Sequence, residues 1–258
     1  MAADNPSSRL PPSATSRQRV EAALPALGLA LTGAQIDALL AYLDLISKWT
    51  RVYNLTAVRE PAGMVTHHLL DCLAAMAPLA AHFGPARRLQ LASSVPESQP
   101  HPEADLEARA GQGSRLLDVG SGAGLPGVVI AICFPGINVT CVDTVAKKAA
   151  FIKQVALTLK LPNLTGLHAR VEALAAPVCP PFDVICARAF ASLADFTHLS
   201  AGALAPSGVW MAMKGKQPAD ELTALPQGID VFHVEQLKVP DLDAERCIVW
   251  MRKRAVRP

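Results

Sequence analysis

The stretch Leu116-Leu-Asp-Val-Gly-Ser-Gly-Ala-Gly-Leu-Pro-Gly127 is followed by an apolar run, a second apolar segment and then Asp143. Its first residues predict a buried strand, which breaks into a glycine-rich loop and opens a helix. Glycine tolerates positive φ and lets a ligand approach the main chain, because no Cβ stands in the way. A carboxylate that ends the next strand can accept hydrogen bonds from both ribose hydroxyls. The stretch therefore predicts a site for a nucleoside-containing cofactor.

The glycine pattern leaves two cofactors open. Residues 122–127 also satisfy the G-x-G-x-x-G pattern of dinucleotide-binding domains, and Asp143 lies about 20 residues further on. Two residues favour S-adenosylmethionine over NAD. The carboxylate of Asp118 suits a cationic amino-acid moiety, and Pro126 lacks an N–H that a pyrophosphate would use. An NAD-dependent oxidoreductase remains the alternative, although little chain follows for a separate substrate domain.

Composition favours a globular protein that works inside the cell. The chain has 258 residues, 51% of them hydrophobic, and a net charge of +2 that neither requires nor excludes a nucleic-acid partner. We find no apolar run near the roughly 20 residues of a membrane span; the longest candidate is residues 128–134. Residues 1–16 lack a signal core, which predicts a cytoplasmic protein. The six cysteines form no C-x-x-C pair, so we expect buried thiols and no metal. We separately expect a monomer.

Four segments follow from the pattern along the chain. We expect a flexible tail over 1–16, a helical subdomain over 17–90, a flexible inserted loop over 91–114 and a cofactor-binding domain over 115–258. In the helical subdomain, Thr32 and Gln35 fit a capping box for a helix that runs to about Trp49. Pro61 suits the first position of another helix. His68 falls on the apolar face of that helix, which favours a core histidine over a ligand.

From residue 115 onward, strands and helices alternate. The predicted helices cover residues 127–134, 146–161 and 193–204, and the predicted strands cover residues 115–119, 138–142, 164–168, 182–187, 208–213, 231–236 and 246–252. Alternation builds a parallel sheet, whereas the short loop between the last two strands predicts an antiparallel hairpin. The fold class is therefore α/β, with a mostly parallel seven-stranded sheet, an antiparallel terminal hairpin and a helical subdomain in front.

Candidate ligand contacts lie at the carboxyl ends of the predicted strands. The third strand is followed by residues 170–172, the fourth by Arg188, and the fifth by Lys214 and Lys216. Three lysines, at positions 147, 148 and 153, begin the helix after Asp143, which indicates an anionic partner or simply a solvated face. We find no G-x-S-x-G elbow, P-loop or metal cluster. The absence of a general base suits an acceptor with a free lone pair, such as guanine N7.

Motifs in a fixed order resemble a known family, the bacterial 16S rRNA guanine-N7 methyltransferases (RsmG, also called GidB). The matching stretches are Lys48–Arg59, His68–Asp71, Asp118–Gly127, Arg170–Glu172, Arg188–Leu193, Met213–Lys216 and Val239–Arg246. The chain departs from the family at His67, where a basic residue usually precedes the histidine. The resemblance implies a Rossmann-like class I methyltransferase fold.

The resemblance also implies a reaction and a set of contacts. The implied reaction is methyl transfer from S-adenosyl-L-methionine to N7 of one guanine in the decoding-region loop of 16S rRNA, on naked RNA or on the small ribosomal subunit. The implied cofactor contacts are Gly120, Leu125, Val171, Glu172 and Arg188, to which we add Asp143 as ribose acceptor on physical grounds. Arg188 is expected to orient the guanine, and Lys147, Lys148, Lys214 and Lys216 to contact RNA. A non-catalytic RNA-binding assembly factor remains a second alternative.

Overall fold

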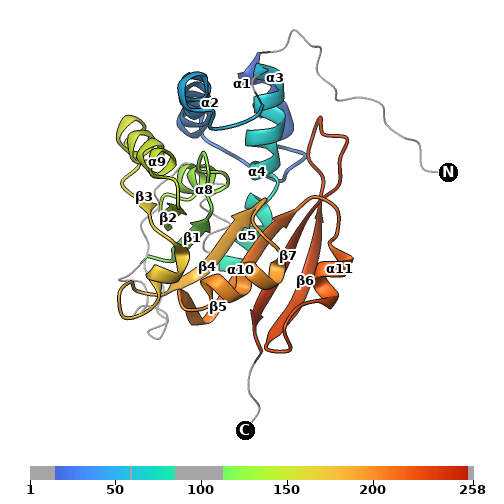
Figure 1. Cartoon of the computed structure of the whole chain (residues 1–258). Helices are drawn as coiled ribbons and strands as arrows, with labels where there is room; N and C mark the ends of the chain where they lie inside the picture. The colour runs from blue at the N-terminus through green and yellow to red at the C-terminus, as the bar shows by residue number, and fades with distance from the viewer. Residues whose placement is uncertain (1–14, 59, 85–112, 255–258) are drawn as a thin grey trace, which may run out of the picture.

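A seven-stranded sheet forms the centre of the molecule (Figure 1). The structure is a computed structural model that describes residues 15–58, 60–84 and 113–254. The strand order is β3-β2-β1-β4-β5-β7-β6, in which β7 runs antiparallel to both of its neighbours and the other pairs are parallel. The strands are β1 Arg115–Val119, β2 Asn138–Asp143, β3 Leu164–His168, β4 Phe182–Arg188, β5 Leu204–Lys214, β6 Ile229–Leu237 and β7 Arg246–Lys253. The predicted fold class is confirmed.

The predicted helices are present to within a few residues, but two short helices, at residues 171–174 and 219–223, were not predicted. The helices are α1 Ser16–Ala23, α2 Gly33–Tyr53, α3 Pro61–Met64, η1 Val65–Leu70, α4 Asp71–Leu73, α5 Met76–Phe83, α8 Gly127–Cys133, α9 Ala146–Thr158, η2 Val171–Leu174, α10 Leu193–Ser200 and α11 Ala219–Thr223. The capping box at Thr32 and Gln35 is present. The prediction was wrong at the end of α10, because Leu204 already pairs with Phe182 as the first residue of β5.

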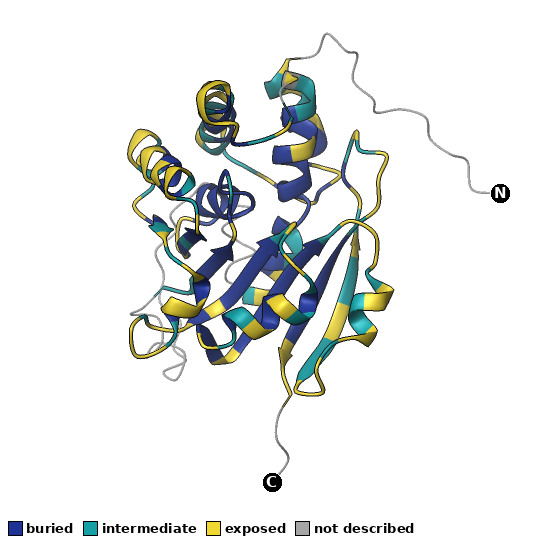
Figure 2. Ribbon diagram, viewed as in Figure 1, coloured by how far each residue is buried: buried dark blue, intermediate teal, exposed yellow. Residues whose placement is uncertain are grey.

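Two hydrophobic clusters cover the two faces of the sheet. In β1, Leu116 belongs to the cluster that includes residues of α2, α8 and α9, whereas Leu117 belongs to the cluster that includes residues of α10. Figure 2 shows the central strands buried and the outer sides of the helices exposed. Strands that are buried on both faces have continuous apolar sequences, which explains why these strands could be predicted from the sequence.

The front helices share one hydrophobic core with the sheet. Tyr42 of α2 donates a hydrogen bond of 2.6 Å to the carbonyl of Ala123 in the glycine loop. Gln35 donates to the carbonyls of Ile132 and Cys133 at the end of α8. The helical section therefore supports the glycine loop directly. The predicted tail and inserted loop, 1–16 and 91–114, lie almost wholly outside the described residues.

A continuous helical run crosses the front section from α3 to α5. Residues 62–83 are long and apolar enough to span a membrane by length and composition, but most of this run is buried inside the fold. The sequence analysis missed this run when it took residues 128–134 as the longest candidate. The middle of the run is a π-helical turn, η1, which is rare and often found at functional sites. His68 is buried on it, as predicted, and Asp71 follows directly and is also buried.

Candidate active site

The glycine loop after β1 adopts backbone angles that favour glycine. Gly120, Gly122 and Gly124 have φ of 64°, 59° and 89°. A Cβ on Gly120 would lie 2.7 Å from the ring of Phe190, which follows β4. The ring therefore packs against bare main chain, and this position accepts no side chain without a shift.

Nearly every amide of this loop donates a hydrogen bond within the chain. The amides of Gly120 and Ser121 donate to the carbonyl of Val142, and the amide of Gly122 donates to Asp143. Further along, the amides of Gly124, Leu125, Gly127 and Val128 also donate hydrogen bonds to acceptors within the chain. A pyrophosphate site needs a set of free amides that point at the ligand. The loop does not offer such a set, and this argues against NAD.

Asp118 does not reach a ligand site, which corrects our expectation that it meets a cationic cofactor moiety. Its side chain is fully buried below the loop, where Oδ2 accepts a 2.8 Å hydrogen bond from the amide of Gly127 at the start of α8. Oδ1 has no partner within the described ranges. Burial raises the pKa of Asp118 to about 7. Its visible role is to fix the loop to α8.

A first pocket of about 420 Å³ opens at the carboxyl ends of β1, β2 and β3. Its lining includes Gly120, Asp143, Lys148, Val171 and Glu172. Asp143 is buried, and its oxygens accept hydrogen bonds from the amides of Gly122 (3.0 Å) and Val145 (2.8 Å). Lys148 lies 3.5 Å from the same carboxylate.

The residues of this first pocket fit a nucleoside. Oδ1 of Asp143 has a second lone pair for a ribose hydroxyl, whereas Oδ2 already faces both the amide of Gly122 and Lys148. Glu172 lies in the first turn of η2, where its own amide and then Arg170 lower the pKa of its carboxyl group. The pocket therefore offers carboxylate acceptors, which suit hydroxyl and amino groups better than phosphates.

A second pocket of about 430 Å³ lies between the π-helical run and the ends of β4, β5 and β7. It is lined by Val58, His67, His68, Asp71, Arg188, Ala189, Met213, Lys214, Gly215, Leu237, Arg246 and Cys247. The loop after β4 borders both pockets, because Ala189 lines the second and Phe190 lines the first.

The carboxylate of Asp71 joins two arginines at this second pocket. Oδ2 accepts a 2.9 Å hydrogen bond from Nη1 of Arg188, and Oδ1 accepts a 2.6 Å hydrogen bond from Nε of Arg246. Arg188 also donates to the carbonyl of His67. The side chain of Asp71 is 5% exposed, so the charge-assisted bonds form in a largely dry environment.

His68 lines the second pocket with an uncharged side chain. Its Nε2 lies 2.9 Å from the hydroxyl of Thr56, and Nδ1 has no partner in the part of the chain that the structure describes. Burial and then the positive charge of Arg188 lower the pKa of His68 to about 4. The ring is therefore uncharged near neutral pH.

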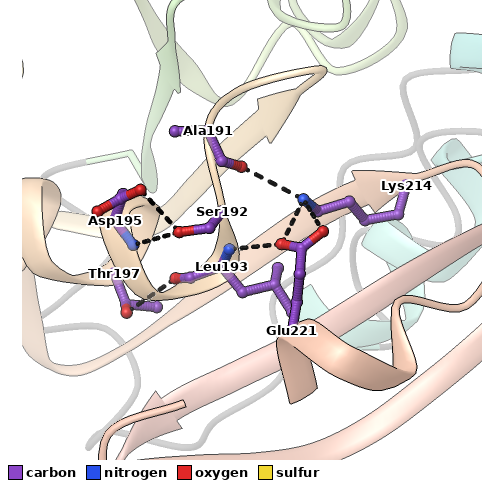
Figure 3. A network of polar contacts seen from close by, with 7 residues as sticks. All are labelled: Ala191, Ser192, Leu193, Asp195, Thr197, Lys214 and Glu221. Carbon is purple, nitrogen blue, oxygen red and sulfur yellow. Dashed lines mark hydrogen bonds and ion pairs between the residues drawn. The ribbon is translucent and has the colours of Figure 1, made fainter. Parts of the chain in front are cut away.

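Lys214 is held by an ion pair at the edge of the second pocket (Figure 3). Its Nζ donates to both carboxylate oxygens of Glu221, at 2.8 and 3.0 Å, and to the carbonyl of Ala191. Glu221 also accepts a hydrogen bond from the amide of Leu193. Ser192 caps α10 by accepting from the amide of Asp195. These contacts fix the loop that separates the two pockets.

The structure divides the predicted site residues into three groups. The first pocket holds Gly120, Asp143, Lys148, Val171 and Glu172, and the second holds Arg188 and Lys214. Leu125 is buried and lines neither pocket, and Lys147 and Lys216 are exposed outside both. The site prediction omitted Asp71 and Arg246. Both stand in stretches that carry the family resemblance, and an aspartate within an apolar helical run was a signal that could have pointed to the first of them.

Comparisons with known proteins identify the family. The model of the family described as rRNA small subunit methyltransferase G matches residues 35–83 and 106–249. A protein of Polaromonas naphthalenivorans named ribosomal RNA small subunit methyltransferase G is 64% identical over 92% of this chain and 95% of its own length. One of the same name from Albidiferax ferrireducens is 60% identical over 93% of this chain and 98% of its own.

Among solved structures, TrmN from Thermus thermophilus aligns over 55% of this chain and 44% of its own, with a TM-score of 0.44 and 22% identity. This distant likeness adds nothing to the functional argument. The match of the family model and the high identity over nearly the whole length show that the chain belongs to the rRNA small subunit methyltransferase G family.

Proposed function

We propose that this protein transfers a methyl group from S-adenosyl-L-methionine to N7 of a guanine in 16S rRNA. The observation that carries the proposal is the pair of pockets on either side of residues 189–190. One pocket offers carboxylates, as a nucleoside requires, and the other offers arginines, as a nucleic acid requires. The names of the family and of its members point to the same class of reaction.

In the first pocket, Asp143 and Glu172 accept hydrogen bonds from the nucleoside end of the cofactor, and Gly120 lines the space beside it. When bound, the cofactor supplies a methyl group on a cationic sulfonium. Arg188 lies next to the loop shared by both pockets, so its guanidinium is placed to orient the acceptor base. Orientation and exclusion of water supply much of the rate enhancement in such transfers.

Of the groups lining the second pocket that could act as a general base, Asp71 and His68 are unsuited to the role, which leaves His67. Both oxygens of Asp71 are bound by arginines, and the pKa of His68 is lowered to about 4 by burial and by Arg188. An acceptor that must lose a proton would find neither Asp71 nor His68 ready to accept it. Guanine N7 carries a lone pair and no proton, so it matches the chemistry of the pocket.

The remaining assignments belong to the same proposal. Lys147 and Lys216 are exposed and have no ion pair in the described part of the chain, so they are the simpler candidates for RNA phosphates. Lys148 and Lys214 already hold carboxylates and contribute by shaping the two pockets. We propose a cytoplasmic monomer that needs no metal or membrane, in which the helical section 17–90 forms the RNA-side wall of domain 115–258.

The deciding experiment follows methyl transfer from labelled S-adenosylmethionine to small ribosomal subunits, and to their deproteinised RNA, from cells that lack the modification. N7-methylguanine is mapped by chemical strand cleavage. We expect one cleavage in the decoding-region loop, and the substrate that is labelled identifies the physiological form. The variant Arg188→Ala should bind the cofactor and fail to transfer. Cofactor binding by wild type without transfer to either substrate would favour the non-catalytic assembly factor.

A further inference from the structure

We propose that Arg246 binds the backbone phosphate of the acceptor nucleotide, and that Asp71 is a positioning residue which orients Arg246 and Arg188 together. This inference rests on the function proposed above. It assigns the second pocket to one nucleotide, with the base at Arg188 and the phosphodiester at Arg246.

The geometry of the two guanidinium groups leaves donors available to a ligand. Arg246, at the start of β7, uses Nε for Asp71 and Nη1 for the carbonyl of Glu245. Arg188 uses Nη1 for both of its bonds. Within the described residues, Nη2 of each arginine has no protein partner. Both side chains line the pocket, at 21% and 25% exposure, so these donors lie where a ligand can reach them.

The charges around the pocket match a single phosphodiester. Asp71 offsets one of the two guanidinium charges, Glu221 offsets the charge of Lys214, and His68 is neutral. Apart from His67, which also lines the pocket, one positive charge is left over. A guanidinium whose orientation is fixed by a buried carboxylate is well suited to a phosphate, because its planar donors match phosphate oxygens.

The chemistry of the acceptor decides which part of the nucleotide Arg246 binds. The commonest arginine–guanine contact in nucleic-acid recognition is bidentate, to O6 and N7. That contact would occupy the lone pair of N7 that must attack the methyl group. The second arginine therefore has to bind elsewhere on the nucleotide, and the phosphate is the remaining strong acceptor.

The sheet order assigns the two arginines to opposite ends of the nucleotide. Arg188 ends β4, beside the loop that borders the cofactor pocket, whereas Arg246 begins β7. With β5 between them, these strands are two steps apart in the sheet, or about 10 Å, and the two side chains converge on the carboxylate of Asp71. Arg188 thus comes from the strand beside the loop shared with the first pocket, and Arg246 comes from a strand farther from that pocket.

The test measures how RNA affinity depends on salt. Binding of deproteinised 16S rRNA is followed across a series of KCl concentrations for wild type, Arg246→Gln and Arg246→Lys. Loss of one phosphate contact should reduce the slope of log Kd against log salt by about 0.7 in Arg246→Gln. Arg246→Lys keeps the charge and should keep the slope.

Arg252→Gln is the matched control, because Arg252 lies on the same strand and its Nε also binds an aspartate, Asp230, at 2.8 Å. Its side chain is outside the pocket, so its slope should equal that of wild type. An unchanged slope in Arg246→Gln, or an equal fall in Arg252→Gln, would overturn the assignment. Cofactor affinity, measured by calorimetry, should be unchanged in each variant and shows that the fold is intact.

Asp71→Asn tests the positioning role separately. The two arginines keep their charges, so the salt slope should remain, while kcat falls by at least about tenfold and KM changes less. A fall in the slope with an unchanged kcat would contradict positioning. If wild type binds RNA and cofactor but transfers no methyl group, the proposed function fails, whereas the salt slopes still decide the phosphate assignment.

Discussion

At the scale of single residues, His68 in the second pocket makes the stability of the native protein depend on pH. Its ring is buried and uncharged, and in the unfolded chain the same imidazole has an ordinary pKa of 6.5. As pH falls through 6.5, the unfolded chain therefore binds a proton that the native protein does not bind until about pH 4. This difference lowers the free energy of unfolding as the solution becomes more acidic.

We predict that between about pH 7 and about pH 5 His68 costs the native state about 2 kcal/mol relative to a His68→Gln variant. Urea unfolding of both proteins across this range measures the effect. Asp118 has a raised pKa in the native protein, so it increases the free energy of unfolding as pH falls. Because this contribution is the same in wild type and in His68→Gln, it cancels in the difference between the two proteins. His198→Gln, at an exposed position on α10, should behave as wild type. A pH-independent difference would show that the imidazole is charged in the native protein.

At the scale of elements, the glycine loop and the loop after β4 depend on each other. Gly120 has a positive φ and also faces the ring of Phe190, whereas Gly28 has a similar φ of 65° with no atom within 4 Å of a Cβ. Alanine substitutions at Gly28 and at Gly120 therefore separate the cost of backbone strain from the cost of steric overlap with Phe190.

We predict that Gly28→Ala lowers the free energy of unfolding by about 1 kcal/mol, from φ strain alone. Gly120→Ala should cost more, up to about 3 kcal/mol, and should also weaken cofactor binding, because Phe190 must move at the mouth of the first pocket. Thermal unfolding and calorimetric titration measure the two effects. Equal losses for both variants, with normal cofactor affinity, would show that the contact between Gly120 and Phe190 is unimportant.

At the scale of the whole molecule, cofactor binding should appear as added stability. A saturating ligand at about a hundred times its Kd adds about 2.7 kcal/mol, because it binds only the native state. We predict that S-adenosylmethionine raises Tm by about 5–10 °C and that NAD leaves Tm unchanged. Asp143→Ala, which removes the ribose acceptor, should lose most of the rise. A Tm shift with NAD would contradict our interpretation of the loop amides.

The parts of the molecule that the sequence revealed are those encoded locally. Continuous apolar runs predicted the strands, and the spacing from the glycine loop to Asp143 predicted that the two meet, as they do through Gly122. The contact of Asp71 with Arg246 joins residues 175 positions apart, and no periodicity encodes it. The π-helical turn was also missed, because its residues are equally compatible with an α-helix.

The bond between Asp71 and Arg246 also sets an order of events during synthesis. The lining of the first pocket lies between residues 119 and 199, whereas the second pocket combines residues 58–71 with residues 188–189, 213–215 and 237–247. A nascent chain therefore contains every residue of the first pocket before it contains all the residues of the second. The second pocket can be complete only after β7 has left the ribosome that is making the chain.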